Sequence, residues 1–372
     1  MSKTTISPIN KYLVWIRSGG RCQYRGCNKV LHTDILTKRN FNQSYIAHIV
    51  ADKPLGPRGD MLRSSLLADD INNLMLMCDT HHRLIDKVDI AGHPEPLLLE
   101  MKREHEDRIN NATNIQPDSS SYVVTYSANI GMHTPNVSYQ IVSKYLLLEY
   151  YPAKDRSIDL GIVNSLNKDS DSSFWETETK NLEDKFDRYL LPLIKSNEIN
   201  HISLFAFAPM PLLIKLGVLI NDIVSVDVRQ KRRNPDTWAF SADVDTEYLF
   251  VPGRGEGKVA LKIELSADIT DDRIYKVVGN DARLYSIRID HPSNDFVKSR
   301  KQIKDFCLKI REVLNVIKKD HGQETTLHVF PAMPIALAVE FGRVWMPKAD
   351  MSLKIYDQNS ALGGFVAAID ID

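Results

Sequence analysis

Residues 72–86, NNLMLMCDTHHRLID, contain the pattern on which the fold of the N-terminal part depends. The apolar run at 73–78 is typical of a buried strand, and residues 80–87 after it predict a short helix. Cys78 ends the strand, and His81 follows after two intervening residues. Such a short-spaced thiol and imidazole are one half of a zinc-ligand pattern.

The other half of that pattern lies earlier in the chain, where Cys22 and Cys27 are separated by four residues. Zinc prefers four thiolate or imidazole ligands in a tetrahedron, supplied as two pairs from separate knuckles. The alternative is three buried apolar cysteines and an unrelated histidine. The paired spacings favour a structural Zn²⁺ site formed by Cys22, Cys27, Cys78 and His81, although His81 stands where a second cysteine is usual.

The distribution of residue types divides the chain in two. Six of the eleven histidines and three of the four cysteines precede residue 110. Residues 1–115 carry a formal charge of +3, whereas the remainder carries −4. A polar Asn/Thr/Pro/Ser segment follows a charged, helix-forming stretch near residue 110. We therefore expect a multidomain protein with a domain at 1–112, a linker at 113–121 and a second domain at 122–372.

Composition excludes several classes of protein. No run of apolar residues is long enough to span a membrane, so we expect no membrane partner. The first residues lack the charged-then-apolar order of a signal peptide. Four cysteines in 372 residues do not form a disulfide framework, so a cytoplasmic location is expected.

The N-terminal motifs together resemble those of HNH endonucleases of the ββα-metal type. The resemblance rests on "AHI" at 47–49 within an expected strand at 45–51, "GPRGD" at 56–60, and the stretch 72–86. It implies a zinc-stapled ββα-metal HNH domain over 1–112 that hydrolyses double-stranded DNA.

The resemblance also implies roles for individual residues. His48 matches the histidine that acts as a general base on water. Asn73 matches the asparagine that orients this histidine or the metal shell, and His82 matches a ligand of a catalytic Mg²⁺ ion. Asn73 is also expected to be a ligand of this ion, together with His82 and waters. Arg58 is expected to hold a DNA phosphate by bidentate contact.

Three points of this interpretation stay open in the sequence. Asn72 is a rival for the asparagine role. Ala47 stands where many HNH enzymes carry an acidic metal ligand, and Asp60, Asp69 and Asp70 are alternative sources of that carboxylate. The histidines are also compatible with a zinc-stapled module that lacks activity.

The C-terminal domain contains an internal repeat. Residues 201–230 and 327–358 each show an apolar strand, a Met-Pro pair, an apolar helical run, a glycine and a closing strand. An amphipathic helix precedes each unit. This order predicts parallel sheets in two related α/β halves, repeat one at about 122–245 and repeat two at about 246–372.

This duplicated arrangement, with "FPAMPIALAVEFGR" at 330–343, resembles the SAVED domain, which is built from two CARF-like (Rossmann-like) repeats. HNH–SAVED proteins are effectors of the bacterial anti-phage systems called CBASS. The resemblance implies a DNase that is activated by a cyclic di- or trinucleotide. A homodimer or higher homo-oligomer on activation is expected, because pairing front domains of modest charge would strengthen DNA binding.

Parallel sheets bind ligands beyond the carboxyl ends of their strands, so we expect the activator between the repeats. Stacking planes and phosphate-binding cations are the side chains that such a ligand needs. The candidates are Trp345, Lys231, Arg232, Trp238, Tyr151, Tyr356, and the strand-end residues Met210 and Met333.

Two other functions fit the same sequence. The first is an ungated restriction-type HNH nuclease whose C-terminal domain recognises DNA, although the acidic charge of that domain disfavours it. The second is a zinc-dependent binding module without catalysis.

Overall fold

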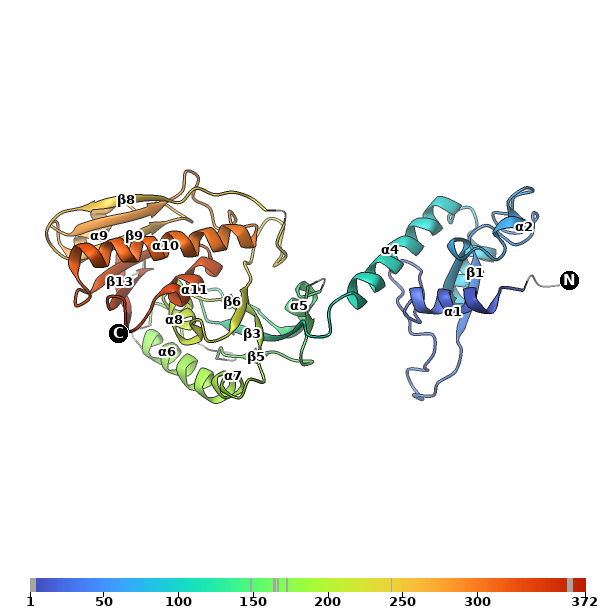
Figure 1. The fold of residues 1–372 in the computed structure, drawn as a ribbon, viewed down its shortest axis with the longest axis horizontal. Coiled ribbons are helices and arrows are strands. Elements are labelled where there is room, and N and C mark those ends of the chain that lie inside the picture. The colour runs from blue at the N-terminus through green and yellow to red at the C-terminus, as the bar shows by residue number, and fades with distance from the viewer. Residues whose placement is uncertain are drawn as a thin grey trace. The chain divides into compact units, whose positions relative to one another are not determined.

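The computed structural model describes residues 5–147, 149–162, 165, 167–171, 173–241, 243–359 and 364–372. It divides into two compact units, one ending at Gln116 and the other beginning at Pro117 (Figure 1). The division falls within the segment 113–121, between helix α4 (Glu95–Thr113) and strand β3 (Ser120–Ser127).

Two antiparallel strands form the sheet of the N-terminal unit, β1 (Ser44–His48) and β2 (Leu74–Cys78). All five residues of β2 are buried, which explains its unbroken apolar sequence. Helix α3 (Asp79–Arg83) follows β2 directly and continues into the π-helical turn η2 (Leu84–Val88). The order of these elements is therefore strand, strand, helix, and the first strand ends at His48 rather than at the predicted residue 51.

Three further helices complete this unit: α1 (Pro8–Arg17), α2 (Ser64–Leu67) and the 3-10 turn η1 (Ile71–Asn73). Helix α1 begins where the Ser7 hydroxyl accepts a hydrogen bond from the backbone N–H of Asn10 (3.4 Å). Its buried side packs with β2 and α4 in one apolar cluster. This cluster positions the loop and the helix that carry the cysteines and His81.

Repeat one contains a five-stranded, wholly parallel sheet. Its order is β4-β3-β6-β7, and β5 pairs with the other part of β3. Its strands are β3, β4 (Tyr151–Pro152), β5 (Ile158–Asp159), β6 (His201–Phe207) and β7 (Ser225–Val228). Its helical segments are α5 (Tyr139–Val142), η3 (Ser143–Tyr145), α6 (Phe174–Lys185), η4 (Phe186–Leu190), α7 (Leu191–Lys195) and α8 (Met210–Ile220).

Repeat two contains a six-stranded sheet of order β13-β12-β11-β9-β10-β8. The four inner strands are parallel to one another, and the edge strands β8 and β13 are antiparallel to their neighbours. The strands are β8 (Leu249–Arg254), β9 (Val259–Glu264), β10 (Arg283–Arg288), β11 (Leu327–Ala332), β12 (Leu353–Asn359) and β13 (Gly364–Ile371). The helices are α9 (Asp271–Val278), α10 (Arg300–His321) and α11 (Ile335–Val344).

The antiparallel edges differ from the wholly parallel sheet that the repeat pattern predicted. Strand β13 begins only five positions after β12 ends. A parallel return requires a crossover of a dozen or more residues, so a connection this short imposes an antiparallel pairing. The prediction of parallel strands therefore holds for repeat one and for the interior of the second sheet.

The two repeats pack against each other through helices α8 and α11, which share one core cluster with both sheets (Figure 1). A Cβ atom added to Gly217 would lie 2.0 Å from the Val339 carbonyl oxygen. Reciprocally, a Cβ on Gly342 would lie 2.0 Å from the Ile214 carbonyl oxygen. Only glycine permits this backbone contact, which explains the glycine in each repeat.

The repeats align differently from the predicted match of the two Met-Pro pairs. Pro209 caps the N-terminus of α8, and Pro334 caps that of α11 with nearly the same backbone angles. Each crossing glycine comes eight residues after its capping proline. Met333-Pro334 therefore corresponds to Ala208-Pro209, and the predicted match was wrong by two residues.

We expect Gly342→Ala to destabilise the C-terminal unit by about 1–3 kcal/mol, because the new methyl group forces α8 and α11 apart. Thermal unfolding of the purified chain measures this effect. Lys319→Ala, on the exposed side of α10, is the surface control and should leave the melting temperature nearly unchanged. An unchanged melting temperature in Gly342→Ala would contradict the close crossing.

Candidate functional site

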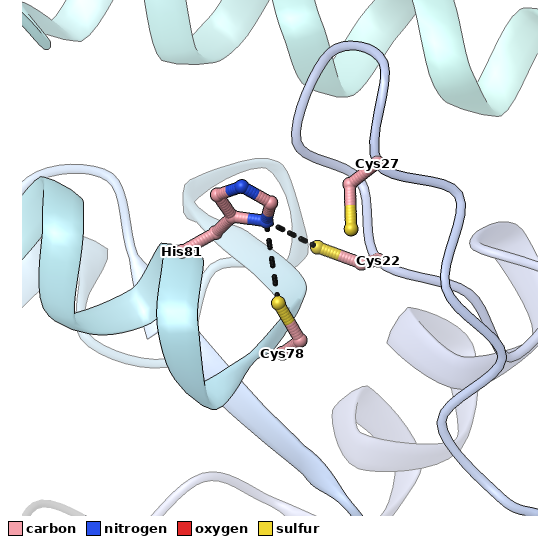
Figure 2. A group of neighbouring side chains, drawn as sticks. All are labelled: Cys22, Cys27, Cys78 and His81. Carbon is pink, nitrogen blue, oxygen red and sulfur yellow. Dashed lines mark hydrogen bonds between the residues drawn. The ribbon is translucent and has the colours of Figure 1, made fainter.

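Four potential metal ligands converge in the N-terminal unit, and Figure 2 shows them around one point. Cys22 and Cys27 come from the loop after α1, Cys78 from the end of β2, and His81 from α3. The imidazole Nδ1 lies 3.2 Å from the Cys78 sulfur and 3.7 Å from the Cys22 sulfur. Their four ligand atoms all lie within 4.8 Å of one another.

This geometry fits a tetrahedral zinc ion. With Zn–S and Zn–N distances of about 2.3 and 2.0 Å, neighbouring ligand atoms lie roughly 3.5 Å apart. Burial raises the pKa of the Cys22 thiol to about 12 when no cation is present. A thiolate at this buried position therefore needs a positive ion beside it. The residues that the sequence predicted as zinc ligands do form a possible metal-binding group.

The backbone of the cysteine loop holds the first pair in place. The Cys22 N–H donates to the Lys29 carbonyl (2.9 Å), and the Cys27 N–H donates to the Tyr24 carbonyl (3.0 Å). Gly26 adopts a positive φ of 83°, which a tight turn between the two cysteines requires. The sequence thus encodes the knuckle locally.

An aromatic and histidine network orients His81, and no sequence pattern had indicated it. The Tyr24 ring stacks on the His81 imidazole with centroids 4.1 Å apart and planes within 2°. The Tyr24 hydroxyl lies 2.9 Å from His93 Nε2, and His93 Nδ1 lies 2.6 Å from the Asp89 carbonyl oxygen. Such surrounding contacts fix the ring of a metal ligand and increase metal affinity.

His48 and His82 occupy the strand and the helix beside this group. His48 is the last residue of β1, and its Nε2 lies 2.9 Å from the Ala68 carbonyl oxygen. A proton on Nε2 satisfies this contact and leaves Nδ1 with its lone pair. The His82 ring, on α3, stacks on Tyr45 of β1 with centroids 4.7 Å apart.

Asn73 has a different role from the predicted magnesium ligand. Its side-chain oxygen accepts a hydrogen bond from the Val50 N–H (2.8 Å), and its amide donates to the Val50 and Leu67 carbonyls (2.9 and 3.0 Å). The residue is only 4% exposed. The buried amide therefore tethers the loop that follows His48 and is not placed to coordinate an ion. Asn72, its rival, lies on the surface beside α4.

The structure also contradicts the predicted DNA-phosphate role of Arg58. Its side chain is 7% exposed. The guanidinium donates to the Ile49 and Ile85 carbonyls, each at 2.6 Å, and to the Asp86 carboxylate at 2.6 Å. A guanidinium occupied in this way joins the end of β1 to the helix after β2, and it does not reach solvent.

Asp86, which the sequence analysis did not single out, places a carboxylate beside His82. Asp86 Oδ2 lies 3.3 Å from His82 Nε2. Their four-residue spacing on a helix was the available signal. The three aspartates considered earlier have local structural roles: Asp60 and Asp70 accept nearby backbone N–H groups, and Asp69 binds Ser7 and Asn10 at the start of α1.

The C-terminal unit contains a cavity of about 390 Å³ at the carboxyl ends of β6, β9 and β11. Both repeats line it, and the N-termini of α8 and α11 open onto it. Of the predicted ligand residues, Met210, Met333 and Lys231 lie in its wall. The cavity is thus at the place where the topology predicts a ligand.

The predicted aromatic planes do not line this cavity. Trp345 is 2% exposed, and its indole N–H donates to the Met351 carbonyl (2.9 Å). Trp238 is equally buried and packs edge-on against Phe205. Core packing therefore accounts for both tryptophans, and their prediction as stacking planes was wrong.

The remaining predicted ligand residues also point elsewhere. Tyr356 is 4% exposed and lies with its ring on Phe330. The Arg232 guanidinium donates to the Ala239 carbonyl (2.9 Å). Tyr151 lies on the short edge strand β4 and donates to the Pro117 carbonyl. None of the three lines the cavity.

The cavity is built instead from side chains that the sequence analysis missed. Phe365 of β13 and Arg273 of α9 lie in its wall, with the guanidinium carbon 4.8 Å from the ring centroid. Gln230, after β7, accepts the N–H of Ala336 in the first turn of α11 (3.0 Å). Gln230 thereby joins the two repeats at the cavity edge.

Comparison with protein families identifies the C-terminal unit. Residues 182–371 match the family model described as "SMODS-associated and fused to various effectors sensor domain", SAVED. The match covers more than half of the chain, and the protein belongs to this family. The predicted resemblance to SAVED is therefore confirmed over this range. No curated protein matches the chain.

Several solved structures show distant similarity. The Acinetobacter baumannii Cap4 SAVED/CARF-domain containing receptor with the cyclic trinucleotide 2′3′3′-cAAA has 12% identity and a TM-score of 0.41, covering 74% of this chain and 55% of that one. The same receptor in a structure named without a ligand has 11% identity and a TM-score of 0.41, covering 83% and 65%. The Moraxella osloensis Cap4 receptor has 11% identity and a TM-score of 0.37, covering 75% and 60%. This chain thus spans less than two thirds of the length of these receptors.

None of the helices in the described part of the chain is long and apolar enough to cross a membrane.

We expect Cys78→Ser to lose zinc and to unfold the N-terminal unit, because a structural zinc ion contributes about 10 kcal/mol or more of folding free energy. Metal analysis and limited proteolysis of the purified chain measure these effects. Cys307→Ser is the matched control, since this thiol lies on α10 of the other unit. Wild-type zinc content in Cys78→Ser, or its loss in Cys307→Ser, would contradict the site.

Proposed function

We propose that the protein is a DNA endonuclease that a cyclic oligonucleotide switches on, as in an effector of the CBASS type. The observation that carries the proposal is the cavity at the strand ends of a SAVED domain, in a chain whose N-terminal unit has the strand–strand–helix order and the histidines of an HNH motif. The family description, a sensor fused to various effectors, supports a division into sensing and acting parts.

The cavity suits a ligand that carries phosphates. The first turns of α8 and α11 border it, and helix N-termini favour anions. Lys231 and Arg233, on the loop after β7, and Arg273, on α9, supply positive charge. The apolar wall formed by Phe207, Met333 and Phe365 suits the faces of bases, as in binding by stacking.

In this proposal the N-terminal unit hydrolyses DNA, and His48 is the general base. The lone pair of its Nδ1 accepts a proton from the attacking water, while the contact of Nε2 with Ala68 keeps the ring oriented. His82 and Asp86 are the side chains that would hold a divalent cation, which supplies charge at the phosphate when bound. Asn73 and Arg58 keep the intervening loop in place.

Assembly is part of the proposal. The formal charge of +3 on residues 1–115 gives little non-specific affinity for a phosphate backbone. Joining two or more copies on activation raises the effective concentration of the nuclease units on one duplex. The activator would therefore act by changing the oligomeric state, which light scattering with and without the ligand measures.

Plasmid cleavage with Mg²⁺, with and without a panel of cyclic di- and trinucleotides, tests the proposal. We expect cleavage only with an activating nucleotide, and a rate at least about 100-fold lower in His48→Ala, because a general base is lost. His32→Ala is the matched control, an exposed histidine outside the site. Cleavage without any nucleotide would favour an ungated nuclease, and undiminished cleavage by His48→Ala would contradict its role.

The gate has its own test in a charge reversal. We expect Lys231→Glu to raise the activator concentration needed for cleavage at least about tenfold, since a cavity cation that meets phosphate is inverted. Arg232→Ala is the neighbouring control, because its guanidinium binds the Ala239 carbonyl away from the cavity. An equal activator requirement in Lys231→Glu and the wild type would contradict the assigned cavity.

A further inference from the structure

Acidic as well as basic residues line the SAVED cavity. Among the described residues, four aspartates line it together with the three cations named above. Carboxylates repel phosphates, so they do not serve the phosphate groups of a ligand. The four aspartates are Asp169, Asp268, Asp295 and Asp357.

Two of these carboxylates have structural partners. Asp295 accepts the backbone N–H groups of Arg233 (2.9 Å) and Asn234 (3.3 Å), which shapes the loop after β7. Asp169 accepts the Gly131 N–H (2.8 Å). Asp268 is exposed at the rim after β9. Hydrogen bonds to the backbone therefore account for Asp295 and Asp169, and Asp268 is solvated.

Asp357 is the remaining carboxylate. It is half-buried on β12, in a wall of the cavity that also contains Gln358 and Phe365. Its carboxyl group interacts with the backbone N–H of Gln358, and no side-chain partner for it is found within the described ranges. Burial, together with the negative charge of Asp169, raises its pKa to about 7. Near neutral pH a large fraction of this carboxyl group is therefore protonated, with an O–H donor beside a carbonyl acceptor.

We propose that Asp357 reads the base edge of the activator, and that it binds adenine as a neutral carboxyl group. This inference rests on the proposed function, in which the cavity holds a cyclic oligonucleotide. Adenine presents a ring-nitrogen acceptor beside its amino donor. A neutral carboxyl group complements both, donating its O–H to the ring nitrogen and accepting from the amino group. An ionised carboxylate accepts only, so it loses one of the two hydrogen bonds to adenine.

Guanine responds to pH in the opposite way. Its ring N–H and its 2-amino group are two adjacent donors, which an ionised carboxylate accepts in parallel. An adenine-bearing activator should therefore bind less tightly as the pH rises, whereas a guanine-bearing one should not. The other charged groups that face the same cavity are three aspartates and the cations Lys231, Arg233 and Arg273. Among the described residues, no histidine lines it.

Calorimetric titration of the full chain with 3′3′3′-cyclic triadenylate and 3′3′3′-cyclic triguanylate, at pH 6 and pH 8, tests the inference. The affinity for the adenine ligand should fall about tenfold between these pH values, in proportion to the fraction of neutral Asp357. The affinity for the guanine ligand should not fall. Asp357→Asn, whose amide keeps a donor beside an acceptor, should bind the adenine ligand equally at both pH values, and Asp357→Ala should bind it at least about tenfold more weakly at pH 6.

The matched control is Asp370→Asn on the neighbouring strand β13, where the carboxylate pairs with Lys354 (3.2 Å) outside the cavity. It should keep the wild-type pH dependence. If the wild type binds the adenine ligand with no pH dependence, or if Asp357→Ala binds it as tightly, the role of Asp357 is wrong while the sensing function stands. If the wild type binds no cyclic nucleotide of the panel, the sensing function fails, and this inference fails with it.

A measurement without ligand gives a second check. A carboxyl group whose pKa is raised on folding is most favourable when protonated, so its contribution to stability is lost as the pH rises through about 7. Asp357→Asn should therefore raise the melting temperature relative to the wild type at pH 8 more than at pH 5. An equal effect at both pH values would contradict a neutral Asp357 in the free protein.

Discussion

The crossing of helices α8 and α11 determines where the ligand cavity can form. At Gly217 and Gly342 the two backbones approach so closely that no side chain fits between them. Each helix begins at a capping proline directly after the strand that borders the cavity. The crossing therefore fixes the distance between the two strand ends. A ligand that touches both ends acts on elements of both repeats, which is what a sensor built from a duplication requires.

In the N-terminal unit, a long loop separates the two strands and must be held in place by other contacts. Much of the loop between β1 and β2 has no regular structure, so its backbone groups need other partners. Asn73 and Arg58 provide them with side-chain hydrogen bonds to carbonyls on both sides of the loop. The cysteine and histidine group anchors the other end of β2. The strand of His48 and the helix of His82 are thus held by the loop contacts at one end of the sheet and by the cysteine–histidine group at the other.

Spacing in the sequence predicted those features that depend on local chain geometry. The pairs around Cys22 and Cys78 indicated a four-ligand group, and the repeated glycines indicated a duplicated α/β unit. The alignment of the repeats through their Met-Pro pairs failed, because the shared constraint is the capping proline and not the methionine before it. The antiparallel edges were missed because strand order depends on contacts far apart in sequence.

Burial explains most of the failures at the candidate sites. Trp345 and Phe365 look equally suited to stacking in the sequence, and both are buried, yet only Phe365 lies in the cavity wall. Arg58 was predicted to hold a DNA phosphate, but its side chain faces inward to carbonyl groups. Asp357 gains its interest from Asp169, a neighbour that only the folded chain brings close. Asp86, in contrast, follows His82 by four residues, a helical spacing that the sequence analysis did not use.

Hydrogen-exchange mass spectrometry of the full chain, with and without 3′3′3′-cyclic triadenylate, tests the central claim most directly. Bound ligand should slow exchange in the segments that line the cavity, at the starts of α8 and α11 and in the loop after β7. The groove formed by Tyr189, Lys154 and Glu198 is a second hollow in repeat one and should show no change. Protection at that groove, or none at the cavity when the ligand is bound, would contradict the account.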